Sequence, residues 1–475
     1  MPLILPGNVA SATASTSDNS CRFNKADSAN MYKANGGTGN RRTWTISIWV
    51  KRSLVGAEQH MFSVRNDTTT PYVEARFEAN DTVQFYDYTG AGNYVFRFVT
   101  NATFTDTSAW SNFVFKLDTE QGTEANRAKI YHNGAEITSF STAVYPSEDD
   151  DTSANVSGYN STVGNLYGSV HLFSGYIAEF CLIDGLALAP TSFGEFEDSL
   201  WKPIDVSGLT FGTNGFYLDF EDSANLGNDA NGGTDLTEVN LDATDQALDA
   251  PTNSFATINP SNVNEMTLSQ GNCVVTSNSS PRTDDNARGL LEYSKKTGKW
   301  YWEVKTTGTY YPGVVGICSE NLGTGDDLSG SEGVYAIQNW GGTYAARREN
   351  GTTAETAGFP NPTNGQIFNL AFDAGNGKLY IGNNGSYFSQ DGSAGDPAGG
   401  SNETFASIDT NLFWIPWFEA RSTSQNGQFN FGGCSGFTVS SGNTDENGYG
   451  NFEYAVPDGF LALCTQNLET DPVTN

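Results

Sequence analysis

Short runs in which apolar and polar residues alternate recur along the chain. In Trp44–Val50 the even positions are apolar and the odd positions mostly polar. Successive side chains of a strand point to opposite faces, so this pattern predicts half-buried β-strands. Two further sets alternate in the same way: Phe113, Phe115 and Leu117, then Tyr176, Ala178, Phe180 and Leu182.

The segment Lys129–Ile137 predicts a β-hairpin. Two strand-like runs flank the dipeptide Asn133-Gly134. Asn and Gly accept the positive φ angles of a type I′ turn, which makes this dipeptide a strong short-range hairpin signal.

The second half of the chain repeats the alternation with larger side chains. Trp300, Trp302 and Val304 fall on one face of a predicted strand, while Tyr301, Glu303 and Lys305 fall on the other. We therefore expect Trp302 to be a core residue. A second inward face is predicted for Phe368, Leu370 and Phe372.

These runs predict an all-β protein made of two antiparallel β-sandwiches in series. A chain of 475 residues is too long for one small core. The segment from Glu221 to about Asn262 is rich in Asp, Asn, Gly, Thr and Pro, and lacks sustained alternation. It is interpreted as a linker or as an extended segment lying along a surface. The predicted divisions are an N-terminal arm (1–14), a first sandwich (15–222), a polar linker (223–262), a second sandwich (263–468) and a tail (469–475).

Composition narrows the class of partner. The formal charge is -31, from 55 acidic and 24 basic residues, so binding to nucleic acid is disfavoured. Charged residues make up only 17% of the chain, which does not fit a disordered acidic tail. No run of about 20 apolar residues occurs, so no membrane span is expected. The six cysteines are scattered singly, without the spacing of a structural zinc site.

Two ordered sets of motifs resemble known domain families. The segments 43–51, 110–115, 130–134, 163–165 and 173–188 resemble, in this order, a laminin-G-like domain of the concanavalin A-like lectin/glucanase superfamily over roughly residues 15–200. The segments 298–304, 368–373, 379–385 and 430–432 resemble a SPRY domain. SPRY domains are β-sandwiches that bind partners and carry out no chemistry, so this resemblance implies a binding protein without catalysis.

A further resemblance spans the whole chain. The segments 1–14, 213–229, 249–260 and 454–468 are similar to those of tailed-bacteriophage virion proteins of the fibre and surface-appendage type. This resemblance implies a non-enzymatic protein exposed on the virion surface. Its expected partners are other virion proteins, further copies of itself and a host-surface glycan. A purely structural capsid-decoration protein without a ligand is an alternative.

The superfamily also contains glycosidases, so a polysaccharide depolymerase or glucanase is another alternative. The E-x-D-x-x-E arrangement of laminarinase-type enzymes is absent. Its nearest imitation is Asp219, Glu221 and Asp222, which we interpret as a solvated acidic edge. His60, His132 and His171 lie far apart in sequence, and His132 is expected to face solvent at the hairpin turn. No catalytic residue is assigned.

Aromatic residues in predicted loops and strand ends are candidates for ligand binding. Sugars stack an apolar face on an aromatic ring while polar groups bond their hydroxyls. The alternative is that these rings cover strand ends or pack one domain on the other. The candidates are Tyr86, Tyr88 and Tyr94 in the first half, and Tyr310, Tyr311, Trp340, Tyr344 and Arg347 in the second.

No cofactor is expected, although calcium is an open alternative because oxygen ligands are abundant. The run Glu148–Asp151 and the residues Asp219, Glu221 and Asp222 would supply such ligands, but none follows an EF-hand pattern. The run is interpreted first as a solvated loop.

The N-terminal arm carries an apolar triplet, Leu3, Ile4 and Leu5, between Pro2 and Pro6. The prolines hold the triplet extended, and nothing nearby in the sequence would bury it. We expect these three residues to anchor the chain to the particle or to a sister subunit.

Overall fold

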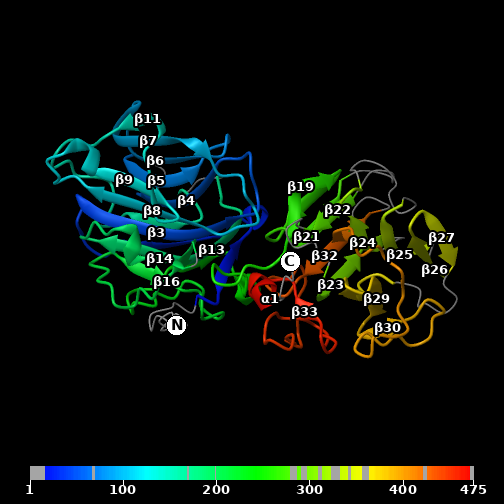
Figure 1. Cartoon of the computed structure of the whole chain (residues 1–475). Coiled ribbons are helices and arrows are strands. Elements are labelled where there is room, and N and C mark those ends of the chain that lie inside the picture. The colour runs from blue at the N-terminus through cyan, green and yellow to red at the C-terminus, as the bar shows by residue number, and fades with distance from the viewer. Residues whose placement is uncertain are drawn as a thin grey trace, which may run out of the picture. The chain divides into compact units, whose positions relative to one another are not determined.

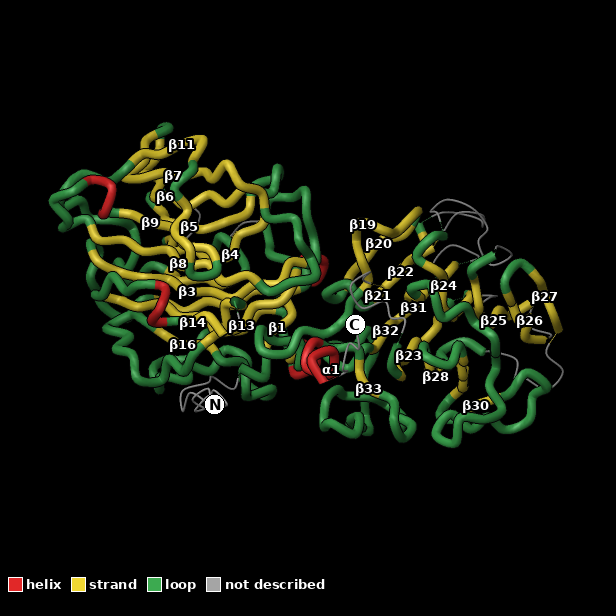
Figure 2. Tube along the Cα trace, viewed as in Figure 1, coloured by secondary structure: helices red, strands yellow, loops and turns green. Residues whose placement is uncertain are grey.

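A computed structural model of the chain describes residues 17–470, except 67–69, 168–170, 198, 279–285, 290–296, 309–312, 323–331, 341–343, 356–362 and 421–424. Two compact units divide the chain, Met1–Thr252 and Asn253–Asn475. Strands dominate both units (Figures 1 and 2), with a single six-residue α-helix, α1 (Thr465–Thr470), among the described residues. The predicted all-β class with antiparallel sandwiches in series is confirmed.

The first sheet of the first unit has the order β10-β9-β8-β3-β13-β1-β18, with β16 also paired to β13. Its strands are β10 (Ala135–Ile137), β9 (Ala128–His132), β8 (Ser111–Asp118), β3 (Thr43–Arg52), β13 (Gly175–Asp184), β1 (Ser20–Phe23), β18 (Gln246–Ala247) and β16 (Phe216–Leu218). The β9–β10 turn has positive φ at Asn133 (46°) and Gly134 (78°), which confirms the hairpin predicted from the Asn-Gly dipeptide.

The second sheet has the order β11-β7-β6-β5-β4-β12-β2-β17. Its strands are β11 (Phe140–Val144), β7 (Asn93–Thr103), β6 (Thr82–Gly90), β5 (Tyr72–Phe77), β4 (Gln59–Arg65), β12 (Asn160–Val163), β2 (Asn30–Ala34) and β17 (Thr237–Val239). A separate hairpin pairs β14 (Gly194–Glu197) with β15 (Leu200–Pro203).

The core of the first unit is made by residues of both sheets. Trp44, Ile46, Ile48 and Val50 of β3 are buried in one apolar cluster with Phe85 of β6. The Trp44 and Phe85 rings meet edge to face with centroids 5.7 Å apart. The alternation seen in the sequence therefore marks the inner face of this sandwich.

Strand β13 departs from the simple alternation. A bulge lies between Ala178 and Cys181, and Glu179 there has a φ of 46°. An extra residue makes the side chains on its two sides change faces relative to simple alternation. Ile177 therefore faces the same core as Phe180. The expectation that Tyr176 and Ala178 share a face with Phe180 is wrong for this reason.

The start of the segment interpreted as a polar linker is part of the first unit. Its residues up to Thr252 contribute β17 to one sheet and β18 to the other. Asp249 forms a fully buried ion pair with Lys51, with a Nζ–Oδ2 distance of 2.6 Å, and accepts a hydrogen bond from Trp110 Nε1. The structure therefore places residues 223–252 in the first unit, and the units divide after Thr252, within the segment 223–262.

The second unit also contains two sheets. One has the order β19 (Ile258–Asn264), β22 (Asn286–Gly289), β31 (Trp414–Glu419), β24 (Val314–Ser319), β25 (Val334–Trp340), β26 (Tyr344–Glu349) and β27 (Thr352–Glu355). The other has the order β20 (Met266–Ser269), β21 (Val274–Ser277), β32 (Asn426–Asn430), β23 (Lys299–Thr307), β28 (Ile367–Asp373), β29 (Lys378–Asn383) and β30 (Ser386–Phe388), and β33 (Leu461–Ala462) runs parallel to β23.

Strand β23 is covered on both faces. Trp300, Trp302 and Val304 lie in the core, and Trp302 is 1% exposed, which confirms it as a core residue. On the other face, the buried Glu303 carboxylate accepts hydrogen bonds from the backbone N–H groups of Glu453 and Tyr454 at 3.0 and 2.8 Å. This carboxylate therefore fixes the chain before β33 against the sheet.

All six cysteines are buried, and none forms a disulfide bond. Among the described residues, no helix is long and apolar enough to cross a membrane.

Candidate functional site

The outer face of β4–β7 in the first unit carries three rows of side chains, set by the strand register. Core residues such as Val73, Ala75 and Phe77 point inward, so the residues between them point outward. Paired residues share a face, and the resulting rows are Arg65–Tyr72–Tyr88–Tyr94, Ser63–Glu74–Tyr86–Arg97 and His60–Arg76–Gln84–Val99. We call these three rows the β4–β7 face.

Four tyrosine rings of this face form one connected cluster. Tyr72 contacts Tyr88 and Tyr86, with ring centroids 5.5 and 5.9 Å apart. Tyr94 contacts the same two rings at 5.2 and 5.7 Å. Tyr72, Tyr88 and Tyr94 are half-buried, whereas Tyr86 is only 4% exposed and forms the floor of the cluster. The cluster therefore offers partly exposed aromatic surface on rigid strands.

Three guanidinium groups surround the tyrosines. Arg65 lies over the ring of Tyr72 at 5.0 Å and Arg97 over the ring of Tyr94 at 4.9 Å. Arg76 lies over Tyr86 at 5.2 Å. Each arginine keeps its ring in place by a cation–π contact and holds hydrogen-bond donors beside it. Aromatic faces next to fixed donors suit a polyhydroxylated or anionic ligand.

Glu74 is a fully buried carboxylate in the middle row. Burial by itself would raise its pKa, but the pKa is lowered overall because His60 and Arg76 face the carboxylate. Its oxygens lie 3.1 Å from His60 Nδ1 and 3.0 Å from Arg76 Nη1. Glu74 therefore stays ionised and orders the charged groups of the neighbouring row.

A cluster of possible metal ligands lies at the start of β4. One ligand atom from each of Glu58, His60 and His171 lies within 4.8 Å of the other two. The hydrogen bond between His60 and Glu58, together with the charge of Arg76, lowers the pKa of Glu58 to about 2. Two of the three histidines of the chain thus meet although they are 111 positions apart, a proximity that the sequence did not predict.

A pocket of about 300 Å³ lies elsewhere in the first unit. Phe77, Phe104, Trp110 and Phe113 supply its aromatic walls, and His132 lines it as well. The imidazole of His132 packs against Phe104 and Phe113 at 4.9 and 5.0 Å, and burial lowers its pKa. The expectation that His132 simply faces solvent is therefore wrong.

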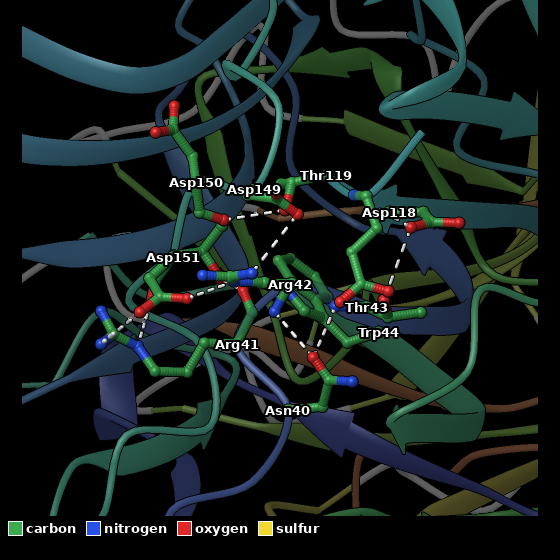
Figure 3. A network of polar contacts seen from close by, with 12 residues as sticks. Asn40, Arg41, Arg42, Thr43, Trp44, Asp118, Thr119, Asp149, Asp150 and Asp151 are labelled. Carbon is green, nitrogen blue, oxygen red and sulfur yellow. Dashed lines mark hydrogen bonds and ion pairs between the residues drawn. The ribbon is translucent and has the colours of Figure 1, made fainter. Parts of the chain in front are cut away.

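Asp149 and Asp151 of the acidic run Glu148–Asp151 lie beside Arg41 and Arg42 (Figure 3). Asp151 pairs with Arg42 at 2.8 Å and with Arg41 at 3.5 Å, and Asp149 pairs with Arg42 at 3.3 Å. These carboxylates, which a calcium ion would need as ligands, are thus already paired with guanidinium groups.

The acidic residues proposed as the nearest imitation of a glycosidase site lie just after β16. Asp219 accepts a hydrogen bond from the backbone N–H of Glu221 at 3.1 Å, and Asp222 accepts one from Ala224 at 2.9 Å. These two carboxylates close local turns. Asp219, Glu221 and Asp222 follow the strand, so they do not line a sheet face as the carboxylates of laminarinase-type enzymes do.

The residues predicted to bind ligand fall into three groups. Tyr86, Tyr88 and Tyr94 lie together on the β4–β7 face. Sequence reasoning missed Tyr72, Arg65 and Arg97 there, because their proximity depends on strand register across four strands. Trp340 ends β25 and pairs with Tyr344 of β26, and Arg347 pairs with Ile337, but only their backbone is described. Tyr310 and Tyr311, and the anchoring residues Leu3, Ile4 and Leu5, lie outside the described residues.

Comparison with known proteins gives one family match. Residues 25–190 match the laminin-G family model described as the concanavalin A-like lectin/glucanases superfamily. No curated protein sequence matches the chain.

Solved structures similar to the chain include the human HERC1 SPRY domain, at 14% identity, covering 36% of this chain and 96% of that chain with a TM-score of 0.28. Domains LG4-5 of the mouse laminin alpha1 chain are similar at 11% identity, covering 96% of this chain and 100% of that chain with a TM-score of 0.31. A native heptameric SAP-like pentraxin from Limulus polyphemus is similar at 13% identity, covering 36% and 78% with a TM-score of 0.28.

Proposed function

We propose that this protein is a non-enzymatic surface component of a tailed-bacteriophage virion, of the fibre or receptor-binding type, and that its first unit binds a host-surface glycan. The β4–β7 face is the proposed binding surface. The observation that carries the proposal is the cluster of four tyrosines, three of them partly exposed, with Arg65 and Arg97 at its edges.

The physical basis is the match between this face and a sugar. The half-buried rings of Tyr72, Tyr88 and Tyr94 offer apolar surface to the axial C–H face of a pyranose. The guanidinium groups of Arg65 and Arg97 can donate hydrogen bonds to hydroxyl or carboxylate groups at its rim. The side chains stand on four paired strands, so little order has to be gained on binding. The match of residues 25–190 to a superfamily that contains lectins supports the same role.

The experiment separates binding from catalysis. Purified full-length protein is added to host cells and to the polysaccharides extracted from them. We expect retention on the cells without release of new reducing ends. Release of reducing ends would favour the depolymerase alternative, and no retention on any host surface would favour the structural capsid-decoration protein.

The N-terminal arm is proposed as the attachment to the particle. Leu3, Ile4 and Leu5 supply an apolar triplet that a neighbouring virion protein or a sister subunit can bind. Deleting residues 2–7 should leave both units folded and abolish incorporation into particles or oligomers. Normal incorporation of the truncated chain would move the anchor to a face of one of the sandwiches.

A further inference from the structure

Three nitrogen and oxygen donors converge at the start of β4, a central strand in the second sheet of the first unit. His60 Nε2 lies 3.2 Å from Glu58 Oε1, and His171 Nδ1 lies 3.8 Å from the same oxygen. Ligands about 2.0–2.2 Å from a tetrahedral zinc ion are roughly 3.4 Å apart. These two separations are thus within a few tenths of an ångström of those in a metal site, and all three ligand atoms lie within 4.8 Å of one another.

The orientation of His60 is fixed from behind. The Nδ1 of this imidazole lies 3.1 Å from a Glu74 oxygen, and the side chains of His60 and Glu74 are 1% and 0% exposed. A carboxylate that holds one ring nitrogen of a histidine orients the other nitrogen towards a metal and increases its basicity. Glu74 therefore acts as a positioning residue for Nε2 of His60.

The backbone brings His171 to the same place. The N–H of His60 donates a hydrogen bond to the carbonyl of His171 at 3.1 Å. The two imidazole rings are stacked with centroids 5.5 Å apart. Because His171 is tied to the end of β4 in this way, its ring stays near Glu58 although its side chain is 47% exposed.

Charge around the cluster favours a cation. Arg76 contacts three carboxylates: Glu58 at 2.7 Å, Glu74 at 3.0 Å and Glu78 at 2.8 Å. The three carboxylates outnumber the one guanidinium group, and a proton on His60, which lies between Glu58 and Glu74, can supply a second positive charge. A divalent cation bound by Glu58, His60 and His171 would take the place of that proton and add positive charge beside the carboxylates.

We propose that Glu58, His60 and His171 form a binding site for a divalent transition-metal cation, with Zn²⁺ the ion that the donor set fits best. Two imidazoles and one carboxylate are borderline and hard donors that suit zinc better than calcium. Three protein ligands leave a coordination position for water or a ligand group. The site adjoins the tyrosine cluster, because Arg76 contacts both Glu58 and Tyr86, but it contains none of the four tyrosines and does not depend on glycan binding.

The proposal is tested with untagged full-length protein stripped of metal by a chelator. Zn²⁺ affinity is measured by competition with a chromophoric chelator, and the visible bands of the Co²⁺-loaded protein report the ligand geometry. We expect one Zn²⁺ per chain. His171→Gln and Glu58→Gln should each lower the affinity at least tenfold, because each removes one ligand from a partly exposed position.

His132→Gln is the matched control, since it removes the third histidine of the chain, which lies outside the cluster. Its zinc affinity should equal that of the wild type. Circular dichroism of each variant shows whether the fold is retained. Failure of the wild type to bind Zn²⁺ at micromolar concentration would overturn the proposal. Equal affinity in His171→Gln and wild type would also overturn it, leaving the cluster as a set of structural ion pairs.

Discussion

Buried carboxylates of the first unit differ in protonation because different groups face them. Glu74 meets His60 and Arg76, and its pKa is lowered despite burial. No cation is among the groups that shift the pKa of Glu179. Burial, and then the charges of Asp219 and Glu221, raise this pKa to about 7. The Tyr217 hydroxyl donates a hydrogen bond to the Glu179 carboxylate at 2.6 Å, which opposes the rise only in part. The two residues show that burial alone does not decide the charge of a carboxylate.

Glu179 leads to a prediction about stability and pH. Because its folded pKa of about 7 lies above the ordinary value of 4.5, the folded state binds the proton more tightly than the unfolded chain does. The resulting stability is fully present below pH 4.5 and is lost as the pH rises through 7, on the order of 3 kcal/mol. Glu179→Gln retains an acceptor for Tyr217 and should remove this loss. Urea denaturation of both proteins from pH 4.5 to 8 measures it; equal pH dependence would contradict the assignment.

The Lys51–Asp249 ion pair leads to a second prediction. Both side chains are buried, so Asp249→Ala removes the carboxylate that pairs with a buried ammonium group and the acceptor of the Trp110 N–H. We expect a loss of about 3–5 kcal/mol in the free energy of unfolding. Asp151→Ala is the control, because it removes an exposed carboxylate paired with arginines and should cost less than about 1 kcal/mol. Similar losses in the two variants would show that Asp249 contributes little.

The sequence predicts which segments form strands better than it predicts how these strands pair. Alternation identified β3, β8 and β23, and the Asn-Gly dipeptide identified the β9–β10 hairpin, because these signals are local. The bulge at Glu179 shifts a face by one residue and leaves no local signature in the sequence. The proximity of Tyr72 to Tyr88 and of His60 to His171 depends on pairing between strands and loops, so composition and spacing could not reveal it.

The strands after residue 222 were missed for a related reason. β17 and β18 are short and polar, and a segment rich in Asp, Asn and Gly lacks a periodic signal. Their order comes instead from pairing with β2 and β1 and from buried contacts of Leu226, Leu236 and Asp249.

This arrangement predicts how the first unit can be truncated. A fragment ending at Thr252 should show a cooperative thermal transition, whereas a fragment ending at Asp222 should lose it or melt at a lower temperature. The shorter fragment lacks both edge strands and the Asp249 carboxylate that pairs with the buried Lys51. Identical melting of the two fragments would show that the segment 223–252 does not belong to the folding unit.

In the whole molecule, the strands of two sandwiches form the scaffold. Among the described residues, the side chains proposed to bind a glycan or a metal ion lie on or beside the β4–β7 face of the first unit. The first unit holds the tyrosine cluster and three arginines on neighbouring strands of one sheet, with the Glu58–His60–His171 group at the start of β4. The second unit buries its best-defined polar groups, such as Glu303, in structural contacts. The proposed glycan binding is placed on the first unit because the described tyrosine and arginine side chains gather there.

The central claim is that the β4–β7 face binds the glycan, and calorimetric titration of host polysaccharide into the full-length protein tests it most directly. Tyr88→Ala removes a half-buried ring of the cluster, and Phe196→Ala removes a ring that is 63% exposed on the separate β14–β15 hairpin. We predict that Tyr88→Ala weakens binding at least roughly tenfold, or about 1.4 kcal/mol, while Phe196→Ala leaves it unchanged. Unchanged affinity in a folded Tyr88→Ala variant would contradict the account.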